Sequence, residues 1–331
     1  MEVCRMDRNS EWKNNVRILG VVEDIDDILY LKWSASGIEF ETFSESIEIE
    51  CVAEYNLIEE SPYLKISVYT EHEIIEKKSR IEVGKSKIKI YDNLKKEKVK
   101  IRIIKLTEEQ YGKVGISSLL MDDVCIPTRE LERKIIFIGD SITAAYGVEG
   151  INGVSTFSTA DQDVSKSYAY LSSEYLNAEC RIFAYSGNGI ISRWIPENQE
   201  LPNTDQLLPE IIPFVQEYDP SLIVCNLGTN DASYTRRNVK REQEFSKSYL
   251  EFIRKLQKHF KDVPILIIYG IMEKSLSKCI KEIAEESGVF YFELPLQKEE
   301  DGLGTDAHPG EKIQRELSYL LSKEIRKIMV W

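Results

Sequence analysis

A short apolar run that ends in Gly-Asp-Ser limits the possible folds of this chain more than any other stretch. It lies in KIIFIGDSITAAYG at residues 134–147. The run 135–138 is long enough for one buried strand and too short for a helix, and it breaks at Gly139. Ser141 is therefore expected just beyond the carboxyl end of a strand. In open α/β sheets ligands bind at that edge, because loops and helix N-termini present backbone N–H groups there.

Three later stretches contain further candidate site residues at the ends of predicted strands or helices. Gly187 lies in AYSGNGI after the apolar run 181–185, and Asn230 lies in LGTND after the run 222–227. His308 lies in GTDAHPG, just before the last amphipathic segment. Each residue thus follows a strand or precedes a helix. The four blocks together form a specific pattern, whereas Gly-Asp-Ser alone would be a weak signal.

Ser, Gly, Asn and His in this order resemble the SGNH hydrolases, also called the GDS(L) esterase family. The resemblance extends from about Ile135 to the helix after His308. It implies that Ser141 is the nucleophile of an acyl transfer. It also implies an oxyanion hole made by the backbone N–H groups of Ser141 and Gly187 and the side-chain amide of Asn230.

His308 is the expected general base. A serine hydroxyl is a weak nucleophile at neutral pH and needs a positioned base to take its proton. The chain has three histidines: His72 lies among charges in the β region, and His259 closes a helix. His308 precedes a predicted helix start, whose positive end disfavours the imidazolium and keeps the base neutral.

The acid of the triad departs from the usual family pattern, D-x-x-H. Thr305 stands three residues before His308, and Asp306 stands two before it. Either Asp306 contacts the imidazole Nδ1 and fixes its tautomer, or a backbone carbonyl does so and Asp306 stabilises the loop. Asp301 is a weaker alternative.

Other residues beside the blocks have expected roles. Asp140 and Asp231 are expected to hold their loops by accepting hydrogen bonds from nearby backbone N–H groups. Tyr146, Trp194 and Tyr234 follow the blocks closely, and aromatic rings can pack against the apolar faces of sugars. Core packing is the alternative for each ring; Trp194 and Tyr146 are the predicted substrate-binding aromatics.

From about residue 16 to residue 125 the apolar pattern has period two. Such alternation predicts half-buried strands, with these residues inward: Ile47, Ile49, Cys51, Leu64, Ile66, Val68, Val99, Ile101 and Ile103. Turn-rich or charged pieces separate the strands, at residues 34–37, 84–86 and 91–98. We predict an all-β sandwich over residues 1–127, either jelly-roll-like or immunoglobulin-like.

Pro127 and the charged run 128–134 form the expected linker, and from Ile135 buried apolar runs alternate with amphipathic segments. Helices are expected at 241–260 and 275–287, with strands at 265–269 and 289–292. The alternation predicts a three-layer α/β/α, flavodoxin-like domain with a parallel sheet over residues 128–331.

Two further helices carry specific expectations. One begins at Asp163, with Val164, Tyr168, Leu171 and Tyr175 on its apolar face. The last begins at Pro309 and turns inward Ile313, Leu317, Leu320, Leu321 and Ile325. Pro209 and Pro213 leave open whether residues 206–218 form one helix or two.

Composition narrows the partners. The net charge of −13 and the pI near 5.0 disfavour nucleic acid and anionic lipid. The N-terminus has no signal-peptide pattern and no apolar run approaches a membrane span, so we expect a cytoplasmic protein. Six scattered cysteines show no metal-ligand spacing. No disulfide, metal or cofactor is expected.

A β-sandwich before an SGNH domain, the motif GDSITAAYG, the stretch FSTADQDVSKSYAYLSSEYLNA and the close D-x-H-P ending are together similar to carbohydrate esterase family 2. That resemblance implies removal of O-acetyl groups from plant polysaccharides such as xylan and glucomannan, with the acid two residues before the histidine. Members often carry an aromatic residue between the two, where this chain has Ala307. Without an export signal, imported acetylated oligosaccharides are the expected substrate.

Two other functions remain open. A lipase or thioesterase of the wider SGNH group would need an apolar acyl cleft. A non-catalytic carbohydrate-binding protein would combine a β binding module with an inactive α/β remnant, and the intact Ser141, Asn230 and His308 argue against it.

Overall fold

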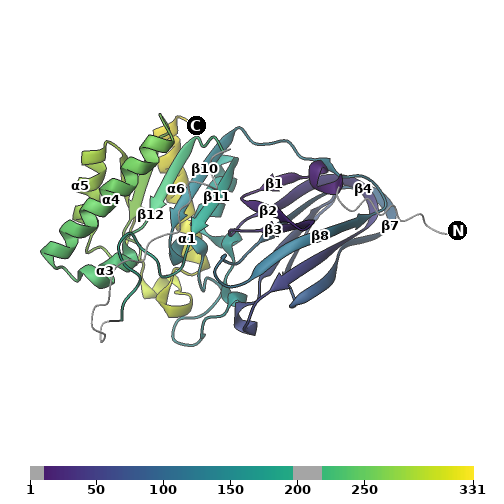
Figure 1. Ribbon diagram of the computed structural model, residues 1–331, viewed down its shortest axis with the longest axis horizontal. Helices are drawn as coiled ribbons and strands as arrows, with labels where there is room; N and C mark the ends of the chain where they lie inside the picture. Colours follow the sequence, from purple (N-terminus) through teal and green to yellow (C-terminus); the bar gives the residue numbers. More distant parts are fainter. Residues whose placement is uncertain (1–10, 197–217) are drawn as a thin grey trace. The chain divides into compact units, whose positions relative to one another are not determined.

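Figure 1 shows the computed structural model of this chain, which describes residues 11–196 and 218–331. The chain divides into two units, Met1–Glu130 and Leu131–Trp331. The sequence predicts the division between residues 127 and 128. The first unit consists of antiparallel strands and the second of a parallel sheet with helices, which confirms the predicted fold class.

Nine strands pair in the described part of the N-terminal unit, in the order β2-β3-β8-β4-β7-β5-β6, with β1 and β9 also on β4. Short 3-10 helices lie at Glu11–Asn15 and Ile58–Glu60. The strands are β1 (Arg17–Leu19), β2 (Val22–Ile25), β3 (Ile28–Leu31), β4 (Gly37–Glu54), β5 (Tyr63–Tyr69), β6 (Ile74–Arg80), β7 (Gly84–Lys105), β8 (Lys113–Met121) and β9 (Ile126–Pro127).

The period-two pattern correctly predicts which side chains are buried. All nine side chains expected inward are buried in one hydrophobic cluster. The long strands β4 and β7 pair along nearly their whole length, from Gly37 opposite Ile104 to Ala53 opposite Gly84. Alternate residues of both strands therefore contribute to the same core.

The predicted separators within residues 84–105 are wrong as breaks between strands. Residues 84–86 begin β7, and residues 91–98 lie inside it. Ser44 pairs with Glu97 and Ser46 pairs with Asp92, so residues 93–96 of β7 lie opposite Glu45 alone. This bulge leaves Asn93, Leu94, Lys95 and Lys96 without partners on β4, and the two strands pair on either side of it.

A buried ion cluster joins three strands and the end of this unit. Glu39 is 2% exposed, and its carboxylate lies 3.2 Å from Arg17 Nη2 and 2.6 Å from Arg102 Nε. The Thr128 hydroxyl donates to the same carboxylate at 2.6 Å. Burial alone would raise the pKa of Glu39, but Arg102, Thr128 and Arg17 outweigh it and hold the pKa below its ordinary value.

We predict that Glu39→Gln lowers the free energy of unfolding by about 3–5 kcal/mol, because two arginines would stay largely buried without their counter-charge. Urea denaturation at pH 7 measures the change. Glu41→Gln is the matched control on the same strand, since Glu41 meets Lys98 at 2.8 Å in a more exposed pair. Loss of that pair should change the free energy by less than about 1 kcal/mol.

The pH dependence has a definite sign. Because the folded-state pKa of Glu39 is lowered, its contribution is present above the unfolded value and is lost as pH falls through the folded value. The stability gap between the wild type and Glu39→Gln should therefore narrow in acid. Equal urea midpoints at pH 7 would contradict this account.

The second unit contains a five-stranded parallel sheet with the order β11-β10-β12-β13-β14. This is the flavodoxin-like strand order. The second strand, β11, is added on one side of the first strand, β10, and the later strands are added on the other side, beginning with β12. The strands are β10 (Arg133–Gly139), β11 (Ala178–Ala184), β12 (Leu222–Asn226), β13 (Ile265–Tyr269) and β14 (Phe290–Glu293).

Helices cover both faces of this sheet. Helix α2 packs on α6, α4 packs on α5, and the two pairs lie on opposite faces (Figure 1). The helices are α1 (Ser141–Ala144), α2 (Tyr168–Leu176), α3 (Thr229–Thr235), α4 (Val239–His259), α5 (Ser277–Ser287) and α6 (Glu311–Met329). Short 3-10 helices lie at Thr159–Asp161, Val164–Lys166, Glu299–Asp301 and Thr305–Ala307. The second unit is thus the predicted three-layer α/β/α domain.

The prediction of one helix that begins at Asp163 is wrong, because the segment forms a 3-10 turn followed by a separate helix. Asp163 caps only the 3-10 turn Val164–Lys166, by accepting from the Ser165 N–H at 2.9 Å. Ser167 then adopts an extended conformation, and its hydroxyl accepts from the Tyr170 N–H at 3.0 Å, so α2 begins afresh. Most of the segment 206–218 lies outside the described residues.

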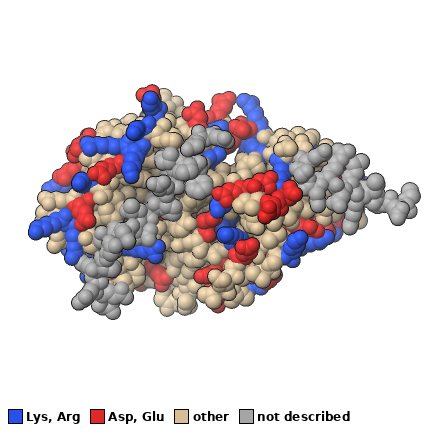
Figure 2. Space-filling view, viewed as in Figure 1, with Lys and Arg blue, Asp and Glu red and all other residues tan. Residues whose placement is uncertain are grey.

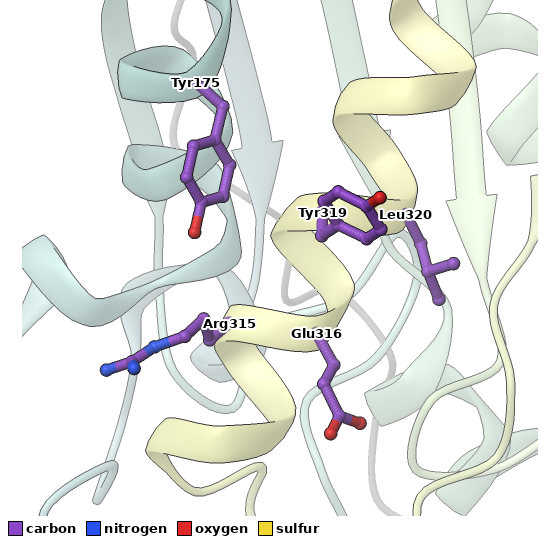
Figure 3. Close-up of a pocket in the computed structure, with 5 residues that line it drawn as sticks. All are labelled: Tyr175, Arg315, Glu316, Tyr319 and Leu320. Carbon is purple, nitrogen blue, oxygen red and sulfur yellow. The ribbon is translucent and has the colours of Figure 1, made fainter.

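Two side chains expected to point inward are instead half-exposed. Tyr175 is 45% exposed and Leu320 is 36% exposed, at the outer edge where α2 meets α6. A third exposed ring, Tyr319, lies beside them. These residues and Arg315 and Glu316 line a surface groove of about 450 Å³ (Figure 3). The narrower apolar stripe that packs inward consists of Ile313, Leu317, Leu321 and Ile325.

Candidate active site

The turn after β10 presents Ser141 at the start of α1. Asp140 caps this helix, and its carboxylate accepts from the Ile142 N–H at 3.0 Å. The turn requires a glycine at position 139, because a Cβ there would lie 2.0 Å from Thr143 Oγ1. The strand end and the cap together fix the serine at the carboxyl edge of the sheet.

His308 lies directly against this serine. Its Nε2 is 2.8 Å from Ser141 Oγ, and its Nδ1 is 3.2 Å from the carbonyl oxygen of Thr305. Two backbone hydrogen bonds hold the loop that carries His308. Gly304 N–H donates to the His308 carbonyl at 2.8 Å, and Thr305 N–H donates to the Gly147 carbonyl at 2.9 Å. A carbonyl only accepts, so Nδ1 carries the proton and Nε2 is left to accept from the serine hydroxyl.

The environment keeps this imidazole neutral. Burial lowers the pKa of His308 below its ordinary value of 6.5, and the nearby Thr305 and Asp306 carbonyls and the Asp306 charge oppose that shift without overcoming it. A neutral imidazole at pH 7 is the form that can take a proton from serine.

Asp306 lies beside the histidine, but its carboxylate has a different partner. Its Oδ2 accepts from the Tyr146 hydroxyl at 3.0 Å. Asp306 and Ala307 both have left-handed backbones, with φ of 53° and 57°. The contact on Nδ1 is therefore the second of the two predicted alternatives, a backbone carbonyl. Asp301 accepts instead from Lys312 at 3.1 Å.

The expected oxyanion residues lie in loops that contact one another. Asn230, in the first turn of α3, donates from Nδ2 to the Asn188 carbonyl at 2.9 Å and, at a longer 3.4 Å, to Asp140 Oδ2. Gly187 has φ of 84°, and a Cβ on it would meet nothing within 4 Å. The Asn230 amide thus links the loops that carry Ser141 and Gly187.

Asp231 and Asp140 hold loops, as the sequence predicts. Asp231 is fully buried and accepts from three backbone N–H groups, those of Ile190, Ile191 and Ser192 at 2.9, 2.8 and 3.1 Å. Burial raises the pKa of Asp231 to about 6, although these three donors act in the opposite direction.

The aromatic residues near the blocks differ in position. The Tyr146 ring stacks on Phe157 with centroids 3.7 Å apart and lies 4.5 Å from the His308 ring. Trp194 is 60% exposed, and Tyr234 donates to Glu244 at 3.3 Å. Sequence reasoning missed Phe157, which lies in no periodic pattern. It also missed the identity of the Thr305 carbonyl, which no side chain type could signal.

The surface of the described residues carries mixed charge. Figure 2 shows acidic and basic side chains interspersed over α4 and α5, where Lys278 and Lys281 pair with glutamates one turn on. No helix in the described ranges is long and apolar enough to cross a membrane. Within these ranges we also find no group of three or more His, Cys, Asp and Glu side chains placed to hold a metal ion.

Comparison with known proteins defines the class. The model of the GDSL-like Lipase/Acylhydrolase family matches residues 137–315, which is more than half of the chain. The matched residues include Ser141, Gly187, Asn230 and His308. The chain belongs to this family, a family of ester hydrolases, which confirms the resemblance to SGNH hydrolases and the class of carboxylic ester hydrolase.

More specific relatives are carbohydrate esterases. The chain is 30% identical over 220 residues to the cellulase/esterase CelE of Acetivibrio thermocellus, covering 61% of this chain and only 26% of that protein. It is 24% identical to an acetylxylan esterase / glucomannan deacetylase of Cellvibrio japonicus, covering 70% and 68% of the two chains. The fold is similar to that of a family two carbohydrate esterase from Clostridium thermocellum in complex with cellohexaose, with a TM-score of 0.81, 23% identity, and 96% and 99% of the chains covered. The resemblance to carbohydrate esterase family 2 is thereby confirmed.

The partner of Nδ1 leads to a direct prediction. If the Thr305 carbonyl orients His308, Asp306→Asn should lower kcat by less than about 10-fold, whereas loss of a true triad carboxylate costs about 10⁴. Steady-state hydrolysis of 4-nitrophenyl acetate at pH 7.5, about one unit above the ordinary histidine pKa, measures the effect. Tyr146→Phe is the matched control, because it removes the hydroxyl that Asp306 accepts from and leaves the carboxylate. A loss approaching 10⁴ in Asp306→Asn alone would instead assign the carboxylate to the triad.

Proposed function

We propose that this chain is a serine acetylesterase that removes O-acetyl groups from plant-derived oligosaccharides of the xylo-, manno- or gluco-type. The observation that carries the proposal is the 2.8 Å contact of Ser141 Oγ with His308 Nε2 at the carboxyl edge of the sheet. Nucleophile and neutral base are already within proton-transfer distance, which is the arrangement that acyl transfer needs.

The first half of the reaction forms an acetyl-enzyme. Ser141 Oγ attacks the acetyl carbonyl carbon as His308 Nε2 takes the hydroxyl proton. The tetrahedral intermediate then collapses, the bond from carbon to the sugar oxygen breaks, and the imidazolium gives its proton to that oxygen. The products are the free sugar hydroxyl and acetyl-Ser141.

The second half returns the enzyme to its starting state. A water molecule attacks the acetyl carbon as His308 takes one of its protons. The bond from the acetyl carbon to Ser141 Oγ then breaks, the proton on His308 passes to that oxygen, and acetic acid leaves and ionises to acetate. The second ring proton stays on Nδ1, which donates to the Thr305 carbonyl throughout, so that one ring nitrogen orients the base while the other shuttles the proton.

Charge that develops on the carbonyl oxygen needs donors. We assign this role to the N–H groups of Ser141 and Gly187 and to the Asn230 amide. One hydrogen of that amide is engaged with the Asn188 carbonyl. The other hydrogen makes only the 3.4 Å contact with Asp140. We assign this hydrogen to the hydrogen bond with the oxyanion.

The substrate class rests on the relatives and on the aromatic rim. The comparison proteins are named as acetylxylan esterase, glucomannan deacetylase and carbohydrate esterase. In this chain Tyr146 lies beside His308 and stacks on Phe157, and a sugar ring can pack its apolar face on an aromatic ring. Trp194, which is largely exposed, is the second proposed substrate contact. A cytoplasmic location and imported oligosaccharide substrates stay predictions.

Acetate release tests the proposal. The wild type and Ser141→Ala should be assayed on acetylated xylo- and manno-oligosaccharides and on 4-nitrophenyl esters of increasing acyl length. We expect acetate from at least one sugar, no release by Ser141→Ala, and activity that falls steeply beyond acetyl. No release from sugars together with turnover of longer esters or thioesters would favour the lipase or thioesterase alternative. Sugar binding without any turnover would favour the non-catalytic one.

The pH dependence follows from the state of His308. Since its pKa lies below 6.5, kcat/KM for 4-nitrophenyl acetate should rise with pH through a midpoint below 6.5 and then level off, because only the neutral imidazole accepts the serine proton. Rate measurements from about pH 4 to about pH 8, which span the ordinary histidine value and the range below it, define the curve. A midpoint at about 7 or above would contradict the neutral carbonyl partner and indicate a carboxylate on Nδ1.

A further inference from the structure

Helix α3 makes several hydrogen bonds to the segment that follows Gly187. Besides the Asn230 contact with the Asn188 carbonyl, the Ser233 hydroxyl accepts from the Ile195 N–H at 2.8 Å. Between these two lies Asp231, with its three backbone donors from residues 190–192. The loop 187–194 is itself closed, because Trp194 N–H donates to the Gly187 carbonyl at 2.8 Å.

The loop fits closely around the Asp231 carboxylate. A Cβ on Gly189 would lie 2.3 Å from Asp231 Oδ2 and 2.7 Å from the Ser192 carbonyl. Position 189 therefore has no room for a side chain. The carboxylate fills the inside of the turn whose first residue is Gly187.

We propose that Asp231 is a positioning residue for the oxyanion hole, acting through the Gly187 loop and its neighbour Asn230. The inference rests on the proposed function. Asp231 touches neither Ser141 nor His308 among the contacts of the described residues. Its effect is to fix the loop against the same helical turn that carries the Asn230 amide, so that both donors keep one relative geometry as charge develops on oxygen.

A carboxylate suits this position better than an amide of the same size. Both of its oxygens accept, and it satisfies three N–H donors at once. In Asp231→Asn one oxygen becomes an NH2 group. If Oδ1 keeps Ile191 and Ser192, that NH2 group faces the Ile190 N–H, so two donors oppose each other and the loop must move.

The test compares Asp231→Asn with a matched control, Asp163→Asn. Asp163 is also buried and accepts from the N–H and hydroxyl of Ser165 at 2.9 and 2.6 Å, but it lies outside the loop 187–194. For 4-nitrophenyl acetate we expect Asp231→Asn to lower kcat by about 10- to 100-fold with KM changed by less than about 3-fold, because an oxyanion donor acts in the transition state. The control should keep kcat within about 3-fold.

A second readout separates positioning from general destabilisation. Methylboronic acid forms a tetrahedral adduct with a serine oxygen, so its inhibition constant reports on the oxyanion geometry. In Asp231→Asn the inhibition constant should rise by the same factor by which kcat falls. In a double-mutant cycle with Asn230→Ala, which should itself cost about 10²–10³ in kcat, the combined loss should be smaller than the product of the single losses.

Three results would overturn the proposal: unchanged kcat in Asp231→Asn, a loss no greater than that of Asp163→Asn, or additive losses in the cycle. If Asp231→Asn does not fold, Gly189→Ala tests the same contact from the loop side and should give the same kcat-specific loss. Failure of the acetylesterase function would appear separately, as a wild type that hydrolyses 4-nitrophenyl acetate but releases no acetate from sugars.

Discussion

The hydrogen bond between Ser141 Oγ and His308 Nε2, 2.8 Å long, is the interaction on which the rest of the site depends. It requires a neutral imidazole with its proton on Nδ1. The Thr305 carbonyl accepts a hydrogen bond from Nδ1 and so fixes this tautomer without placing a charged group on that nitrogen. The carbonyl of Thr305 is held in turn by close packing. A Cβ on Gly150 would lie 1.9 Å from Thr305 Oγ1, so the turn after Ser141 and the histidine loop approach each other with no space for a side chain.

The carboxylates around this pair hold the structure in place. Asp140 caps the helix that begins at Ser141, and Asp231 binds the loop after Gly187. Asp306 accepts from Tyr146, whose ring lies against the histidine. Each carboxylate accepts hydrogen bonds from groups that position a reacting or binding residue. Because burial outweighs the neighbouring groups and lowers the pKa of His308, the imidazole is uncharged at rest and carries positive charge only during proton transfer.

Much of this arrangement is predictable from the sequence, for a topological reason. Parallel strands end at the same edge of their sheet, so Ser141, Gly187 and Asn230, each placed after a buried apolar run, had to converge. The period-two residues from Ile47 to Ile103 likewise gave the β core. The Thr305 carbonyl was not predictable, because every residue has one and the left-handed backbone at Asp306 and Ala307 decides which one faces the ring.

Tyr175 and Leu320 look buried by spacing alone, but α2 and α6 meet along a narrower stripe. Ser167 ends a turn and restarts a helix, which periodicity does not reveal.

The most direct test of the account is to trap the acetyl-enzyme. The protein should be mixed with 4-nitrophenyl acetate, quenched in acid within milliseconds, digested and examined by mass spectrometry. We predict one added acetyl group on the peptide that contains Ser141, present in the wild type and absent from both Ser141→Ala and His308→Ala. Ester hydrolysis with no acetylated Ser141 peptide, or with the acetyl group on another residue, would contradict the assignment of Ser141 and His308 as nucleophile and base.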